Sequence, residues 1–299
     1  MQKSFAIPSI LAASLMSYAA MAQDEAAPAP EGVAPAPDPA APAAAPKAAS
    51  APTAAPAGYP DEYALRPLVV ASGMFQGTLP IVLNLSTSNV LKPVWIPLDL
   101  RWGKTKQLEF FVNHSTPGGS VTSGSGVCLG GTSRNCDGTY NNVNFGAQYS
   151  FLNASGLELA GLLAAQFREL SPDMRFAVDV GVGMKYVAAP VSVKLTPQLG
   201  IGLNKRSSLA NKEELAAPLQ IALQAAPRIA VFLDSGISGK VSHFGDSYAV
   251  PIGIGGSCLA MHGLDVGLEF MLQMLAKATT FTGGATDARM LTLFVSWRE

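Results

Sequence analysis

The chain has 299 residues, of which 14% are charged and 48% are hydrophobic, and 20 Lys and Arg residues nearly balance 21 Asp and Glu residues. A net charge of -1 gives no electrostatic footprint for nucleic acid, so no nucleic-acid partner is expected. Three cysteines and three histidines are too few for a disulfide-rich scaffold or a soft-metal site, and we expect neither a metal nor a cofactor.

The first 22 residues have the pattern of a secretory signal peptide. Lys3 precedes a mostly apolar stretch at residues 5–16, and the sequence AMA at residues 20–22 forms an A-x-A cleavage motif. The apolar stretch is too short to cross a bilayer as a helix. We therefore predict a signal peptide at residues 1–22 and an exported protein.

Residues 23–60 are dominated by alanine and proline. Such a segment cannot bury enough apolar surface to offset the entropy lost on ordering, so it is predicted to be a disordered linker. Proline favours an extended polyproline II conformation, which would make the linker a semi-rigid tether in the periplasm. It would act either as a plain spacer or as a contact to the cell wall.

From residue 73 onward, most segments alternate between apolar and polar residues, which places one set on each face of a β-strand. Residues 175–186 are the clearest example, because their even positions are apolar and their odd positions are polar or small. Nearly all such segments reach the roughly 9 to 11 residues that a tilted strand needs to cross a hydrocarbon core. The predicted strands cover residues 73–86, 94–102, 107–114, 141–151, 157–168, 175–186, 191–203, 215–225, 228–241, 248–259, 264–275 and 288–297.

The connections between these strands fall into two classes. Tight turns are expected at residues 103–106, 152–156, 187–190, 226–227 and 260–263. The intervening gaps are mostly long and polar, as at residues 115–140, 204–214, 242–247 and 276–287, although the gaps at 87–93 and 169–174 are short. This sorting is typical of membrane barrels, whose turns face the periplasm and whose loops face outward.

These patterns predict an all-β fold, an antiparallel up-and-down transmembrane β-barrel of about twelve strands over residues 61–299. A soluble lipocalin-like barrel shares the alternation but points its apolar face inward. Twelve strands are too many for a barrel filled by side chains, and aromatic residues cluster at the strand ends like interfacial girdles, which favours a membrane barrel. The predicted girdle residues are Trp102, Phe151, Tyr186 and Trp297 at the periplasmic rim, and Phe167, Phe176 and Tyr248 at the outer rim.

The polar face of the predicted strands would line the lumen, and it carries seven acids and seven bases. These residues are Asp99, Glu109, Glu158, Asp179, Asp234, Asp265 and Glu269, and Arg101, Arg168, Arg175, Lys185, Lys194, Arg228 and Lys240. A balanced set predicts either weak ion selectivity or internal ion pairs that close the lumen. Glycines on the same face either leave volume for solute or permit strand curvature.

Few residues suggest further chemistry. Cys128 and Cys136 lie in the longest loop of an exported chain and are predicted to form a disulfide that stiffens an exposed loop. His243, Asp246 and Ser247 share one loop, and this grouping is the basis for a less favoured alternative, an outer-membrane hydrolase. Their spacing is too close for a preformed triad and no G-x-S-x-G motif accompanies them, so we expect no enzyme.

Residues 102–110 (WGKTKQLEF), Tyr186 with the short turn after it, and the closing residues 291–297 (LTLFVSW) resemble bacterial outer-membrane β-barrel proteins of the porin-like class. The resemblance covers about residues 62–299 and implies outer-membrane lipid and the barrel assembly machinery as partners. It implies a passive pore for small solutes or ions with weak selectivity. The alternative is a non-conducting structural or adhesive surface barrel that acts through its outer loops, with residues 115–140 as the contact surface.

Overall fold

The structure is a computed structural model that describes residues 58–86, 90–114, 126–130, 136, 139–170, 174–207, 211–278, 284 and 286–299. The predicted signal peptide and the predicted linker as far as residue 57 lie outside the described residues. Within the described ranges, no helix is long and apolar enough to cross a lipid bilayer.

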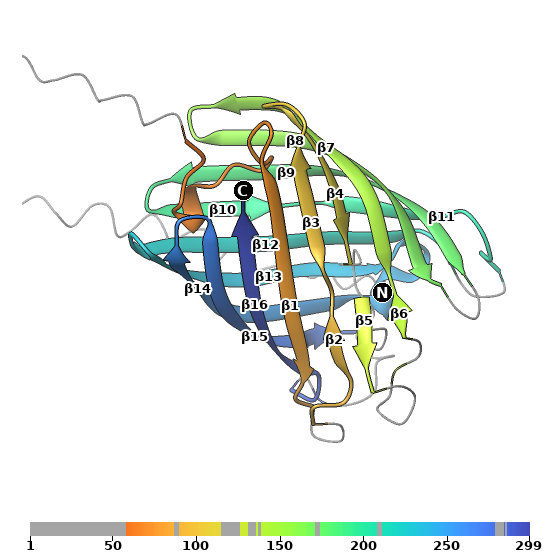
Figure 1. Cartoon of the computed structure of the whole chain (residues 1–299). Helices are drawn as coiled ribbons and strands as arrows, with labels where there is room; N and C mark the ends of the chain where they lie inside the picture. Colours follow the sequence, from red (N-terminus) through yellow and green to blue (C-terminus); the bar gives the residue numbers. More distant parts are fainter. Residues whose placement is uncertain are drawn as a thin grey trace, which may run out of the picture. The chain divides into compact units, whose positions relative to one another are not determined.

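Antiparallel strands make up most of the described chain. They are β1 (Phe75–Asn84), β2 (Val94–Ile96), β3 (Asp99–Gly103), β4 (Leu108–Asn113), β5 (Gly126–Leu129), β6 (Tyr140–Asn141), β7 (Val143–Ala154), β8 (Leu157–Glu169), β9 (Arg175–Ala188), β10 (Val191–Leu195), β11 (Gln198–Gly202), β12 (Glu214–Ala226), β13 (Ile229–Lys240), β14 (Ala249–Met261), β15 (Leu264–Lys277) and β16 (Arg289–Arg298). They form one continuous sheet in which β16 also pairs with β1, from Gln76 opposite Arg298 to Asn84 opposite Met290. This pairing closes the sheet into a barrel (Figure 1).

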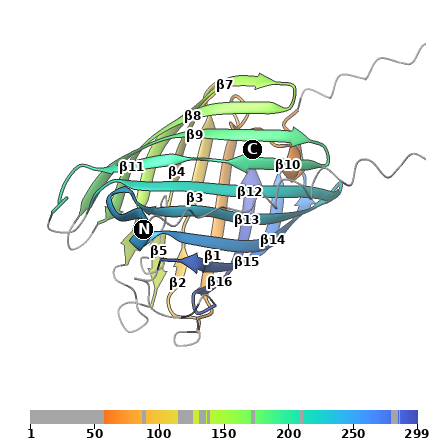
Figure 2. The same ribbon diagram turned by 180° about the vertical axis from the view of Figure 1, so that it is seen from behind.

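Two pairs of short strands each act as one strand of the barrel wall. β2 and β3 follow each other along β1, and β10 and β11 follow each other between β9 and β12. The wall is therefore the predicted closed antiparallel barrel of twelve strands. Figures 1 and 2 show β1, β3 and β16 on one side of the barrel, with β12 and β13 crossing behind them.

The interruptions in these two wall strands were not predicted from the sequence. The predicted strand at residues 94–102 breaks at Pro97, and the one at residues 191–203 breaks at Pro197. Proline has no N–H group to donate to a neighbouring strand, which fits these breaks, although Pro80 and Pro218 lie within the continuous strands β1 and β12. The carbonyl oxygen of Pro197 still accepts a hydrogen bond of 3.0 Å from the amide of Val182, which keeps the wall joined there.

The barrel has two different ends, here called the turn end and the loop end. The turn end carries the tight connections at residues 104–107, 155–156, 189–190, 227–228 and 262–263, together with the start of β1 and the end of β16. The loop end carries the longer connections, one of which folds into the short helices η3 (Val241–His243) and α1 (Phe244–Ser247). The predicted sorting of turns and loops therefore matches the two ends of the barrel.

The predicted disulfide lies at the loop end but is not exposed. β5 pairs with β2 and with β6, so this small hairpin extends the wall at the loop end. Cys128 on β5 is bonded to Cys136, and both are buried against Trp95. The expectation of a disulfide is met, but it packs in a small apolar cluster rather than stiffening an exposed loop, because β5 turns its even-numbered residues toward Trp95.

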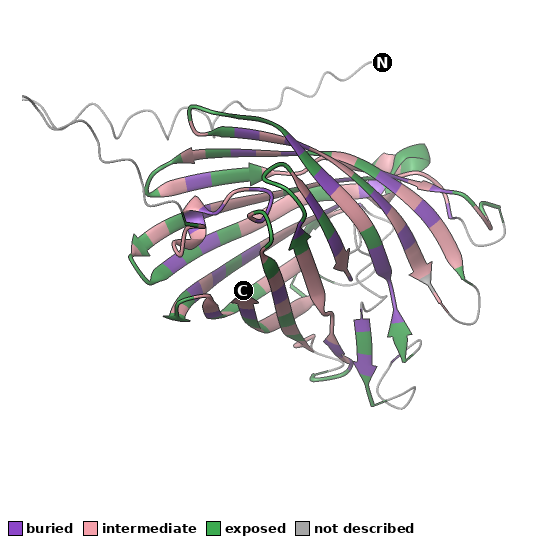
Figure 3. Ribbon diagram, turned by 45° about the horizontal axis from the view of Figure 1, so that its top comes forward, coloured by how far each residue is buried: buried purple, intermediate pink, exposed green. Residues whose placement is uncertain are grey.

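Alternating residues on each strand face either the lumen or the surroundings of the barrel. On β9, Ala177, Asp179 and Lys185 are buried inside, whereas Val180 and Tyr186 on the other face are exposed. Figure 3 shows the resulting alternation of buried and exposed positions along the strands. The outside of the barrel is consequently apolar and its lumen is polar.

Candidate functional site

The structure places the predicted lumen residues mainly on the inner face of the wall. Buried among them are Glu109, Glu158, Asp179, Lys185 and Asp265, and partly buried are Asp99, Arg101, Arg168, Arg175, Asp234 and Glu269. Lys194 also faces inward and lines a small cavity. Arg228 lies in the turn before β13, and Lys240 is the last residue of β13. Both are exposed, so they stand at the two rims rather than along the lumen.

An additional part of the chain occupies the turn end of the lumen. Residues 58–71, here called the lumen segment, precede β1 and include the short helix η1 (Tyr63–Leu65). Ala64, Leu68, Val69 and Val70 in this segment are 0 to 4% exposed, although it belongs to no strand. The segment is therefore packed inside the barrel rather than lying outside it.

Arg66 shows that the lumen segment crosses from one side of the barrel to the other. Its guanidinium binds both carboxylate oxygens of Asp265 on β15, at 2.9 and 2.8 Å, and its carbonyl oxygen accepts a hydrogen bond from Lys185 on β9. On one side of the wall β14, β13, β12 and β10 separate these two strands. One residue of the segment thus contacts nearly opposite sides of the wall.

Buried carboxylates hold the next part of the lumen segment. Glu158 on β8 accepts a hydrogen bond of 2.7 Å from the amide of Leu68, and Glu109 on β4 accepts one of 2.8 Å from the amide of Val70. Arg101 on β3 donates to the carbonyl oxygen of Leu68 and also pairs with Glu109. Charge-assisted bonds of this kind are stronger than neutral ones, so several predicted lumen charges anchor the segment.

An aromatic contact and two glycines of the wall also allow the lumen segment to pack against the barrel. The Tyr63 ring stacks on Phe232 of β13, with ring centroids 5.6 Å apart. A Cβ atom on Gly103 would lie 2.0 Å from the carbonyl oxygen of Ala71, and one on Gly183 would lie 3.6 Å from Leu68. The backbone of the segment can therefore approach Gly103 only because that position has no side chain.

The beginning of the lumen segment is fixed at the turn end. Asp61 accepts a hydrogen bond of 2.8 Å from Nδ1 of His262, in the turn between β14 and β15, and lies 3.5 Å from Arg298. The hydrogen bond from His262 lowers the pKa of Asp61, and the positive charges of His262 and Arg298 act in the same direction. Asp61 therefore favours its charged form in this position.

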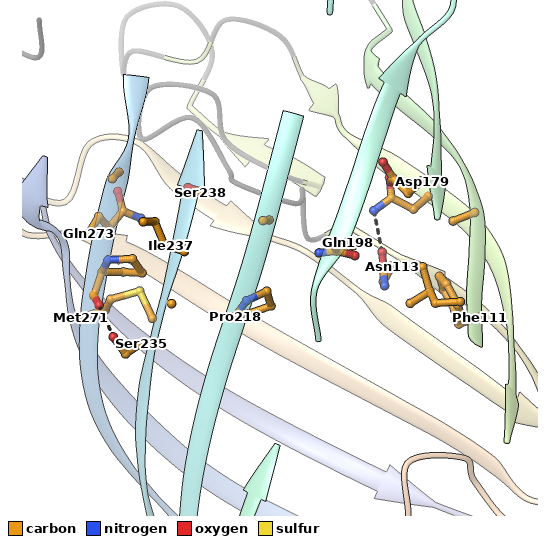
Figure 4. Close-up of a pocket in the computed structure, with 17 residues that line it drawn as sticks. Phe111, Asn113, Asp179, Gln198, Pro218, Ser235, Ile237, Ser238, Met271 and Gln273 are labelled. Atoms are coloured by element: carbon orange, nitrogen blue, oxygen red, sulfur yellow. Dashed lines mark hydrogen bonds between the residues drawn. The ribbon is translucent and has the colours of Figure 1, made fainter. Parts of the chain in front are cut away.

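The loop half of the lumen contains a cavity of about 530 Å³. Its described lining consists mostly of small, amide and apolar side chains, and Asp179 is the ionisable residue among them. In Figure 4, Asp179, Asn113 and Gln198 lie on one side of the cavity and Ser235 and Gln273 on the other. The cavity therefore has room for water and small solutes, with little net charge around them.

Arg168 and Glu214 form an ion pair close to this cavity. Arg168 lies 3.2 Å from Glu214 on β12 and donates a hydrogen bond of 2.7 Å to Gln166. A Cβ atom on Gly200 would lie 2.7 Å from Asp179 and 2.4 Å from Arg168. The absence of a side chain at Gly200 thus allows this acid and this base to lie close together beside the cavity.

Ser247, the serine of the hydrolase alternative, does not bond to the ring of His243. The Ser247 hydroxyl donates a hydrogen bond of 2.8 Å to the backbone carbonyl oxygen of His243, and Nδ1 of His243 lies 3.0 Å from the hydroxyl of Ser242. A nucleophile is activated by a bond from its hydroxyl to the imidazole ring, which Ser247 does not make, and Ser242 is the exposed chain neighbour of His243. Together with Asp246, these residues belong to η3 and α1 at the loop end.

The predicted girdle residues lie at the two ends of the barrel. Trp102, Phe151, Tyr186 and Trp297 are close to the turn end, and Phe167, Phe176 and Tyr248 are close to the loop end. Trp102, Phe151 and Tyr186 are 43, 55 and 53% exposed, so these aromatic rings face the surroundings of the barrel. Phe167 and Phe176 contact each other across β8 and β9, with centroids 5.3 Å apart.

Sequence reasoning missed the lumen segment and its contacts. It assigned residues 61–72 to the start of the barrel and gave no role to Asp61, Arg66, His262 or Arg298. Two signals were available: the apolar run at residues 68–70 directly before the first strand, and the isolated Arg66 next to it. Neither signal shows that the segment turns back into the lumen.

Comparisons with known proteins identify the fold. No protein-family model matches the chain, and no curated protein matches it. An outer membrane channel from Pseudomonas putida F1 is similar with a TM-score of 0.54 and 11% identity, over 82% of this chain and 99% of that one. The NanC porin has a TM-score of 0.52 and 9% identity, and the KdgM porin 0.50 and 7%, each over 74% of this chain and 98% of theirs. The chain therefore has the closed antiparallel β-barrel fold that these outer-membrane porins and channels share.

Proposed function

We propose that the protein is a passive outer-membrane pore for small polar solutes or ions, with weak selectivity. The turn end would face the periplasm, with the linker on that side, and the loop end would face outward. Large apolar side chains such as Phe145, Leu163, Ile254 and Leu268 are 50 to 65% exposed on the outside of the barrel. A contiguous apolar exterior of this kind is favourable in lipid and costly in water, which supports the membrane location.

The observation that carries the proposal is the cavity of about 530 Å³ in the loop half of the lumen. A barrel whose interior served only as a core would fill this volume with side chains. Here alanine and glycine occupy several inward positions of the wall, including Ala164, Ala216 and Gly236. Such residues leave the space open for water and solute.

Weak selectivity follows from the way the lumen charges are paired. Arg101 with Glu109, and Arg168 with Glu214, are oppositely charged neighbours within the lumen. A ring of like charges would favour counter-ions strongly, whereas paired charges largely cancel at a distance. We therefore expect anions and cations to pass at similar rates.

The test is single-channel recording in planar bilayers with purified mature protein and with a variant that lacks residues 58–71. Discrete current steps from either protein, with a small reversal potential across a salt gradient, would support the pore. Silence from both proteins, each shown to be folded by its heat-dependent migration on gels, would overturn it. A large reversal potential would contradict the weak selectivity while leaving the pore itself supported.

The second candidate is a non-conducting surface barrel that acts through its outer loops. The observation in its favour is that the lumen segment, held in place by contacts from Asp61 to Val70, obstructs the turn end of the lumen. Removing residues 115–140 distinguishes the two candidates. Binding to surfaces or cells would be lost if the loops carry the function, whereas conductance would persist if the lumen does.

A further inference from the structure

We propose that the lumen segment is a gate, closed in this structure, that the protein opens by releasing residues 58–71 from the turn end of the lumen. This inference rests on the proposed pore, since a gate requires a path that it can close. It adds that the barrel carries its own obstruction, made from the chain directly before β1. It also assigns a role to the buried charges at the turn end, which the pore alone does not need.

The closed state leaves little free volume beside the segment. The remaining cavity between the segment and the wall measures about 120 Å³ and is lined by Tyr63, Arg66, Arg101 and Lys194, among others. Since one water occupies about 30 Å³ in the liquid, this space holds a few waters. The cavity in the loop half is several times larger, so the turn end is the narrow part of the lumen.

The segment is attached to the wall in a way that permits release. Wall side chains bind backbone groups of the segment, as at Ala64 with Gln224, Leu68 with Glu158 and Val70 with Glu109. Arg66 and Asp61 bind the wall through their own side chains. The hydrogen-bonded pairing of strands begins after the lumen segment in the chain. β1 pairs with β3 and β16 without any contribution from the segment. Release therefore breaks side-chain contacts and leaves the closed barrel intact.

The wall charges would keep partners after release. Removing one member of a buried pair is costly because the other charge is left uncompensated, and this cost would lock a gate shut. Here each wall charge that holds the segment also has an oppositely charged neighbour on the wall. The pairs are Arg101 with Glu109, Arg298 with Asp265, and Lys185 opposite Glu158 in the β8 to β9 register.

The first experiment reverses one charge on the segment and one on the rim. Arg66→Glu places an acid against Asp265 and removes the bidentate contact, whereas Arg228→Glu makes the same change of charge at an exposed turn position of the same end. Single-channel recording should show the open-to-closed ratio of Arg66→Glu raised by roughly tenfold or more over the wild type. Arg228→Glu should leave it unchanged. Equal ratios for all three proteins would overturn the gate.

A reversible crosslink provides a test in which the full chain is retained. Leu68 packs against Ala160 of β8, so Leu68→Cys with Ala160→Cys should form a disulfide that holds the segment in place. The oxidised protein should stay closed, and reductant should restore openings during the recording. The wild type under the same reductant controls for loss of the Cys128 to Cys136 disulfide. Equal conductance before and after reduction of the crosslink would contradict the gate.

Deletion separates failure of the gate from failure of the pore. If the variant lacking residues 58–71 conducts more than the full chain, the gate is supported. If the two conduct equally, the pore stands and the gate is overturned. If both are silent although folded, the pore is overturned, and the gate with it.

Discussion

The two halves of the lumen are lined by the same strands but differ in what they contain. At the turn end, buried charges such as Glu109, Glu158 and Asp265 bind a segment of the chain itself. In the loop half, small and amide side chains surround a cavity of about 530 Å³ in which Asp179 is the ionisable lining residue described. The comparison shows that a charge on a lumen face can anchor another part of the chain rather than line open space.

The largest expected effect lies at the turn end. Asp265→Ala leaves the guanidiniums of Arg66 and Arg298, 9% and 3% exposed, without their shared carboxylate. Because uncompensated buried charge is costly, the free energy of unfolding should fall by about 3 kcal/mol. Urea titration of protein refolded into lipid vesicles measures this, and a loss well under about 1 kcal/mol would mean that the turn end is more hydrated than its burial indicates.

The next prediction tests the assignment of the two faces on which this comparison depends. Val180→Arg places a charge on the outer face in the middle of β9 and should cost roughly 2 to 4 kcal/mol in lipid. Asp179→Asn, one residue earlier on the lumen face, should change the free energy of unfolding little. The same titrations would contradict the assignment if Asp179→Asn were the more destabilising change.

Solute flux tests the open half directly. Ala216→Trp introduces an indole into the cavity, whereas Ala217→Trp places the same ring on the outer face of β12. Liposome swelling in a neutral sugar should slow strongly for the first variant and stay unchanged for the second, provided that both also lack the lumen segment. Equal swelling rates for the two variants would show that the cavity is not on the conduction path.

The smallest expected effect concerns the anchor at Asp61. Its side chain is 33% exposed, so its pairing with His262 and Arg298 should contribute less than about 1 kcal/mol. Since the pKa of Asp61 is lowered in the folded state, this contribution is present above the ordinary carboxyl pKa of about 3.9 and is lost as the pH falls further. Recordings from pH 7 to pH 3 should show an acid-induced rise in openings that Asp61→Asn lacks. Identical pH profiles would remove Asp61 from the gate.

The sequence predicts the wall of the barrel because each strand carries its own alternation. The register of residues 175–186, with Val180 outward and Asp179 inward, depends on period two and on nothing elsewhere in the chain. The breaks at Pro97 and Pro197 could not be placed in this way, because Pro80 and Pro218 also lack an N–H group and yet lie within continuous strands.

The lumen segment could not be predicted in the same way. Its main contact joins Arg66 to Asp265, 199 positions along the chain, and its residues show no periodicity that marks them as internal. The balance of seven acids and seven bases on the polar face indicates ion pairing. It does not reveal that four of these charges also bind the lumen segment. They are Glu109, Glu158, Lys185 and Asp265.

The order of contacts along the lumen segment has a mechanical consequence. From its N-terminal side the chain meets the wall first at Asp61, and then at Tyr63, Ala64, Arg66, Leu68 and finally Val70. Tension applied from the covalently attached N-terminal sequence would load these attachments one after another rather than together. A chain peeled in this manner needs only the force that breaks its strongest single attachment, which is less than the force that would break all of them at once.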